Sequence, residues 1–185
     1  MSRIASYLLV AAFFLQESFV RQGEAAKSFR RQESDRGTTV LLGSTYGVVL
    51  TAAPILNRLA RSPLPAPVAY LGLGLMAGGL ALRYWAVRTL GEFYSRTLRT
   101  EWRHRLVESG PYARVRHPGY AATLLVWTGF GLAQANLVSA LAVVATMGAA
   151  YAYRIRTEEA MLTDALGDEY RAYRERTARL IPGVF

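Results

Sequence analysis

Two polar stretches beside apolar runs carry the side chains best suited to chemistry. The first, SGPYARVRHPGY at residues 109–120, holds two arginines and places His117 directly before Pro118. Proline is well tolerated in the first turn of a helix, so His117 is predicted at or beside a helix N-terminus. The unpaired amides there attract carboxylates and other anions. This stretch could hold a charged ligand, or its polar residues could only anchor a helix end at a membrane surface.

The second stretch, RIRTEE, begins at Arg154 as the last apolar run ends. Arg154 and Glu158 are four residues apart and share one face of a predicted helix. A guanidinium matches the fork of a carboxylate, and a glutamate can accept from a bound cation. The alternative is an exposed ion pair worth little free energy. Tyr170 and Tyr173, farther along, are predicted to form an interfacial aromatic belt.

Composition narrows the classes of site and partner. The 185 residues suggest one domain, and they include no cysteine and two histidines. We therefore expect no metal site. The net charge of +9 lies between long apolar runs in a chain that is 52% hydrophobic, which favours a membrane over a nucleic-acid partner. In GLGLMAGG, Gly74 and Gly78 fit a small-xxx-small packing face better than a nucleotide loop.

Five apolar runs are long enough, or nearly so, for membrane spans of about 20 residues. They cover residues 4–20, 39–56, 67–87, 119–135 and 136–153, and the first could instead be a signal peptide. Asn136 is the main turn residue between the last two, which predicts a tight hairpin. We expect an all-α polytopic membrane protein, with three transmembrane helices in residues 1–87 and a catalytic region in residues 88–185.

The basic residues predict the orientation of these spans. With five spans, eighteen of the 22 basic residues fall in the loops and tail on one side, against three on the other and one inside the third span. Basic loops stay in the cytoplasm. We therefore expect an integral, multi-pass protein, in a prokaryotic cell membrane, with its N-terminus outside and its C-terminus cytoplasmic.

From about Thr89 onward the chain resembles a known family. The runs TLGEFYSRTLRTEWRHRLVESGPYARVRHPGY, RIRTEEAMLTDALGDEYRAY and RLIPGVF resemble the isoprenylcysteine carboxyl methyltransferases, integral membrane enzymes that use S-adenosylmethionine. The resemblance implies a cytoplasmic cofactor pocket formed by the loop between helices three and four and by the C-terminal helix, with a tunnel for a lipid tail. It implies that Arg154, or Arg156 one step along, meets the methyl acceptor. The cofactor residues it implies are His104, Arg105, Leu106, Val107, Tyr112, His117, Pro118, Gly119, Tyr120 and Glu158.

The resemblance also implies the reaction, which is methyl transfer from S-adenosylmethionine to the carboxylate, or a hydroxyl, of a lipophilic isoprenyl-type substrate. The expected partners are a lipophilic small molecule or a prenylated substrate entering from the bilayer, and membrane lipids, with no nucleic acid. A carboxylate is ionised near neutral pH and needs no general base. A phenolic-lipid O-methyltransferase and a phospholipid N-methyltransferase remain open. So do an NADPH-dependent membrane reductase and a non-catalytic membrane sensor.

Overall fold

The computed structural model describes residues 1–19, 37–91 and 106–183. These residues are mostly helical and contain two isolated β-bridges but no strand, so the predicted all-α class is confirmed for this part of the chain. The elements are α1 (Ser2–Phe19), α3 (Thr38–Leu59), α4 (Ala66–Leu90), the 3-10 helix η3 (Gly110–Ala113), α5 (Pro118–Ala133), α6 (Leu137–Leu166) and α7 (Asp168–Arg176).

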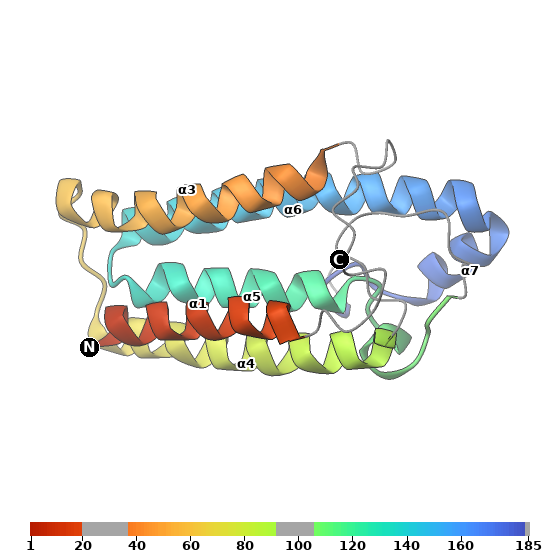
Figure 1. The fold of residues 1–185 in the computed structure, drawn as a ribbon, viewed down its shortest axis with the longest axis horizontal. Helices are drawn as coiled ribbons and strands as arrows, with labels where there is room; N and C mark the ends of the chain where they lie inside the picture. Colours follow the sequence, from red (N-terminus) through yellow and green to blue (C-terminus); the bar gives the residue numbers. More distant parts are fainter. Residues whose placement is uncertain (20–36, 92–105, 184–185) are drawn as a thin grey trace.

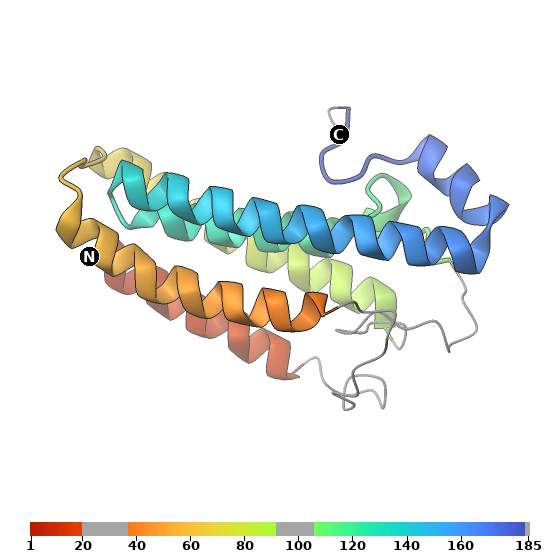
Figure 2. The ribbon, with the colours of Figure 1, turned by 90° about the horizontal axis from the view of Figure 1, so that it is seen from above.

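The five long helices lie side by side in one bundle, with the chain running up and down between its two ends (Figure 1). The N-terminus and the short connections at residues 60–65 and 134–136 lie at one end. The start of α5, the last turns of α6, η3 and α7 lie at the other end, and the view turned by 90° agrees (Figure 2). The two polar stretches identified in the sequence are therefore brought together at the end opposite the N-terminus.

Helices α4 and α5 pack with their backbones in contact because glycines line the seam. A Cβ added at Gly72 would lie 2.6 Å from the Gly129 carbonyl oxygen, and one at Gly79 would lie 2.8 Å from the Ala122 carbonyl oxygen. Small residues permit this approach between helices. The prediction that Gly74 and Gly78 form the packing face was wrong, because the contacts are made by Gly72 and Gly79 instead. A Cβ at Gly74 or Gly78 would meet nothing within 4 Å in the described chain.

The predicted hairpin between the last two long helices is confirmed. Helix α5 ends at Ala133, and the Asn136 side chain caps α6 by accepting a 3.0 Å hydrogen bond from the Ser139 amide. The side-chain Nδ2 of Asn136 also donates to the Ala60 carbonyl oxygen at 2.7 Å, which ties this turn to the end of α3.

The bundle has the character of an integral membrane protein. By length and composition, α3, α4 and α6 are apolar enough to cross a membrane. Helix α1 has 18 residues and α5 has 16, and both pack within the same bundle. The shared core is apolar and includes Phe13, Met76, Trp127, Phe130 and Met147. Large apolar side chains such as Leu71 and Leu141 face outward, as the lipid-facing surface of a spanning bundle requires.

The neighbouring glycines of α4 offer a matched test of this seam. A methyl group at Gly79 would meet backbone atoms of Ala122 and Val126 within 2.9 Å, whereas one at Gly78 would meet no atom of the described residues within 4 Å. We expect Gly79→Ala to destabilise the protein by about 1–3 kcal/mol and to lower its Tm. Gly78→Ala should leave the Tm unchanged or raise it, since alanine favours helix by up to about 1 kcal/mol. Thermal unfolding in detergent measures both, and equal losses in the two variants would contradict the seam.

Candidate active site

The start of α5 is built as the sequence predicts. Pro118 is the first residue of the helix, and His117 is the N-cap residue and is buried. The His117 ring stacks on Tyr120, with centroids 5.5 Å apart and planes 8° apart. An imidazole and a phenol are thereby held together beside the positive end of a helix, where an anion is stabilised.

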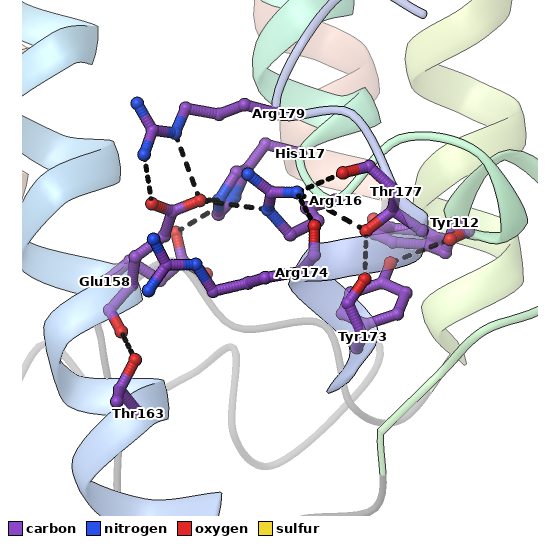
Figure 3. A network of polar contacts seen from close by, with 10 residues as sticks. Tyr112, Arg116, His117, Glu158, Thr163, Tyr173, Arg174, Thr177 and Arg179 are labelled. Atoms are coloured by element: carbon purple, nitrogen blue, oxygen red, sulfur yellow. Dashed lines mark hydrogen bonds and ion pairs between the residues drawn. The ribbon is translucent and has the colours of Figure 1, made fainter. Parts of the chain in front are cut away.

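Glu159 of α6 gathers three cationic or potentially cationic side chains around one carboxylate. Its oxygens lie 3.1 Å from Arg116 Nε, 3.3 Å from His117 Nε2 and 2.8 Å from Arg179 Nη2. Figure 3 shows Arg116, His117 and Arg179 converging on α6 from the loop before α5 and from the tail after α7. The cluster joins three segments that are distant in sequence.

The ionisation of Glu159 follows from these contacts. Thirty residues make α6 about 45 Å long, which exceeds the roughly 30 Å hydrocarbon core and places the end of α6 beyond its apolar part. Burial by itself would raise the pKa of Glu159, but hydrogen bonds from His117, Arg179 and Arg116 outweigh it and lower the pKa to about 2. The group is therefore a carboxylate at any physiological pH.

The tail after α7 returns to the loop before α5 and pairs with it. The Arg116 amide donates to the Ala178 carbonyl at 2.8 Å, and the Ala178 amide donates to the Arg114 carbonyl at 3.0 Å. Arg176 on α7 binds Glu108 through a 2.6 Å contact. These bonds hold the segment around η3 and the tail together as one layer, which covers the end of the bundle where the polar stretches meet.

The two tyrosines of α7 belong to this layer, so their predicted role as an interfacial belt was wrong. Tyr170 and Tyr173 are buried, and the Tyr173 hydroxyl donates a 2.7 Å hydrogen bond to the Tyr112 carbonyl. Burial, then the Glu108 carboxylate, raises the pKa of Tyr173 to about 12, which keeps this donor protonated. Sequence pattern alone did not distinguish a belt from a buried contact, because both use the same amphipathic side chain.

Glu158 faces a different direction from its neighbour. Its Oε2 atom lies 3.8 Å from His117 Nδ1, is buried, and has no hydrogen-bond partner in the described part of the chain. His117 therefore lies between two carboxylates, one of them committed to the cluster around Glu159. Leaving a buried acceptor without a donor costs free energy, which a ligand that brings a cationic donor would recover.

Arg154 is buried and faces the bundle, while Arg156 is exposed. Its Nε donates to the Tyr120 hydroxyl at 3.1 Å, and its Nη1 binds the hydroxyls of Thr38 and Thr39 at the start of α3. Tyr120 thus contacts both Arg154 and the His117 ring. These hydroxyls fix the plane of the guanidinium.

The structure brings most of the predicted site residues to one end of the bundle. Leu106 and Val107 are half-buried in the irregular segment before η3, and His104 and Arg105 lie outside the described residues. Sequence reasoning missed Glu159, Arg179 and Thr38. The adjacent Glu-Glu pair was a usable signal for Glu159, whereas nothing in the pattern of the second span indicates Thr38. The predicted residues gathered here are Tyr112, His117, Pro118, Gly119, Tyr120, Arg154 and Glu158.

Comparison with known sequences decides the family. The model of the isoprenylcysteine carboxyl methyltransferase family matches residues 71–164, just over half of the chain. The chain belongs to this family. The membership of this family confirms the expectation of a membrane methyltransferase.

Relatives of the chain and a solved structure agree with the family. A probable protein-S-isoprenylcysteine O-methyltransferase of Oryza sativa subsp. indica is 27% identical over 86% of this chain and 87% of that protein. The protein-S-isoprenylcysteine O-methyltransferase of Schizosaccharomyces pombe is 34% identical over 60% of this chain and 48% of its own length. The structure of a eukaryotic intramembrane Ras methyltransferase of this family matches all of this chain and 68% of that one, with a TM-score of 0.68 at 23% identity. The structural likeness concerns the fold.

The lowered pKa of Glu159 makes the cluster sensitive to acid. Its stabilising effect is fully present above the ordinary pKa of 4.5 and is lost as the pH falls toward 2. We expect the Tm in detergent to fall over this window by the equivalent of a few kcal/mol. Glu159→Gln should destabilise the protein by about 3–5 kcal/mol at neutral pH, because three donors lose their anion. The acid profile, meaning the fall of the Tm as the pH is lowered, should be flatter in this variant.

Glu158→Gln is the matched control and should retain the acid profile of the wild type. An acid profile that is identical in wild type and Glu159→Gln would contradict the assignment of Glu159 as the carboxylate that holds this end together.

Proposed function

We propose that the protein transfers a methyl group from S-adenosylmethionine to the carboxylate of an S-prenylated cysteine at the membrane surface. One observation carries the proposal. The buried guanidinium of Arg154 lies one helical turn from Glu158, whose buried oxygen has no donor among the described residues, and Tyr120 links this arginine to the ring of His117. A site for an anionic acceptor and a site for a cationic donor molecule are thus adjacent.

The residues at this end fit S-adenosylmethionine. Its ammonium group matches Glu158 Oε2, the buried acceptor for which the described part of the chain supplies no donor. Its carboxylate matches the N-terminus of α5, where Pro118 and Gly119 begin the helix after His117. Tyr112 and Tyr120, with Leu106 and Val107, supply apolar and aromatic surface for the adenosine. The family resemblance adds His104 and Arg105 to the proposed cofactor residues.

Arg154 is the residue proposed to meet the acceptor. Hydroxyls of Tyr120 and Thr38 hold the guanidinium through Nε and Nη1, and the positive charge held in this place attracts and orients a carboxylate. When bound, S-adenosylmethionine supplies a methyl group on a sulfonium, which a carboxylate oxygen can take by in-line displacement. The protein then needs no general base, because the carboxylate is already ionised, and its work is to orient the two reactants. An amine acceptor would require a base, which favours the carboxylate.

The proposed membrane placement has five crossings, with the site at the cytoplasmic face. Helices α3, α4 and α6 are long enough to cross alone, and α1 and α5 lie alongside them (Figure 1). The starts of α3 and α5 and the end of α6 share one end of the bundle. With five spans, the sequence assigns eighteen basic residues to the cytoplasmic loops and tail. The N-terminus is then outside, and a prenyl chain reaches Arg154 from the bilayer. Residues 1–87 form the scaffold and residues 88–185 the catalytic region.

Binding of S-adenosylhomocysteine tests the role of Glu158. A hydrogen bond to a charged group contributes about 1.5–3 kcal/mol, so Glu158→Gln should weaken binding by about 10- to 100-fold. Calorimetry in detergent measures the Kd, with Glu169→Gln, an exposed residue of α7, as the control that should bind as the wild type does. NADPH should not bind. Unchanged affinity in Glu158→Gln would remove Glu158 from the cofactor site.

Turnover tests the role of Arg154 with a matched neighbour. Lysine keeps the charge but loses the planar fork, so Arg154→Lys should lower kcat for N-acetyl-S-farnesylcysteine by about 10- to 100-fold, with little change in S-adenosylhomocysteine affinity. Arg156→Lys, on the exposed face, should retain wild-type kcat. Equal kcat in the two variants would show that Arg154 does not orient the acceptor.

A further inference from the structure

We propose that Arg83 and Glu17, an ion pair inside the bundle, position the first turns of α5 for methyl transfer. The pair joins α1 and α4, and the Arg83 side chain also donates hydrogen bonds to α5, so three helices meet at one guanidinium. The inference rests on the proposed function and extends it to residues that the sequence motifs do not cover.

The contacts of Arg83 span the three helices. Its Nη2 binds Glu17 Oε1 on α1. Its Nη1 donates to Thr123 Oγ1 at 2.6 Å and to the Gly119 carbonyl oxygen at 3.3 Å, both on α5. The guanidinium carbon also lies 5.0 Å from the centre of the Phe13 ring on α1. Arg83 is 7% exposed, so these bonds are made away from solvent.

The position of this pair argues against a role in helix association alone. Arg83 lies seven residues before the end of α4, about 10 Å along the helix axis. Ionisable residues within spanning helices are costly and are retained where they serve a function. One turn earlier on the same face, Gly79 already brings α4 into backbone contact with Ala122 of α5. The apolar seam thus joins the helices, and the ion pair supplies something further.

The ion pair fixes the position and rotation of the first turns of α5. The Gly119 carbonyl accepts from Arg83 and also from the Thr123 hydroxyl at 2.9 Å. Gly119 is two residues after His117 and directly before Tyr120, whose hydroxyl binds Arg154 at 3.1 Å. A rotation or shift of these turns would move both the cofactor side and the acceptor side of the site.

Helix α1 gains a role through Glu17. The carboxylate compensates the charge of Arg83 and orients its guanidinium, so that the opposite edge of the fork points at α5. One residue earlier, Gln16 Nε2 donates to the Leu80 carbonyl of α4 at 3.3 Å, which fixes α1 against α4 beside the pair. Arg83 and Glu17 act through α5, so we class them as positioning residues.

The test removes the hydrogen bonds of the Thr123 hydroxyl to Arg83 and to the Gly119 carbonyl, while leaving the ion pair. Thr123→Val keeps the shape of the side chain but loses the hydroxyl, and Thr123→Ser is the matched control that keeps it. We expect Thr123→Val to lower kcat for N-acetyl-S-farnesylcysteine about tenfold or more and to raise the S-adenosylhomocysteine Kd several-fold. Thr123→Ser should stay within about twofold of wild type in both. Identical values in the two variants would overturn the proposal.

A charge exchange separates positioning from simple clamping. The single variants Glu17→Gln and Arg83→Gln should lower both Tm and kcat. The double variant Glu17→Arg with Arg83→Glu restores an ion pair, but a glutamate at position 83 cannot donate to Gly119 or Thr123. We expect its Tm to recover toward wild type while kcat stays about tenfold lower. Recovery of both would show that the pair is only a clamp and would overturn the proposal.

The two readouts also separate this inference from the proposed function. If the wild-type protein transferred no methyl group to N-acetyl-S-farnesylcysteine, the proposed function would fail. The S-adenosylhomocysteine affinity would still report the setting of His117, and equal Kd values for Thr123→Val and Thr123→Ser would then overturn the positioning role independently.

Discussion

The site depends on one buried carboxylate. Glu159 binds Arg116, His117 and Arg179, which arrive from the loop before α5 and from the tail after α7. Burying this charge is unfavourable, and several charge-assisted hydrogen bonds on its two oxygens offset that cost. Because the partners are distant in sequence, the same cluster sets the cap of α5, the direction of the His117 ring and the return of the tail (Figure 3). The residues proposed to bind the cofactor and the acceptor take their places from this arrangement.

Adjacent residues on a helix point about 100° apart, and the protein uses this difference to separate two tasks. Glu159 faces the cations and holds the structure together. Glu158 keeps a buried oxygen that accepts from no donor in residues 1–19, 37–91 and 106–183, and it lies on the face of α6 that also carries Arg154. In the proposed function, a glutamate pair next to an inward arginine thus combines a structural anion, a ligand-binding anion and an anion-binding cation within six residues. This economy explains how a small helical bundle can hold a polar site at the edge of a membrane.

The sequence predicted those features that depend on local pattern. The apolar run at 67–87 became α4 at Ala66–Leu90, Asn136 made the hairpin turn, and Pro118 began α5 with His117 at its cap. Features that depend on which face of a helix meets its neighbour were missed or wrong. The α4–α5 seam uses Gly72 and Gly79 rather than the glycines between them, since the rotation of α4 is set by its neighbours. Contacts across the chain, such as Arg83 with Glu17 and Arg154 with Thr38, have no local signal.

The most direct test of the account is an experimental structure of the protein with S-adenosylhomocysteine bound. We predict that the amino group of the ligand lies within hydrogen-bond distance of Glu158, while Glu159 keeps Arg116, His117 and Arg179. Binding of that amino group to Glu159 with loss of these contacts, or binding of the ligand at the N-terminal end of the bundle, would contradict it.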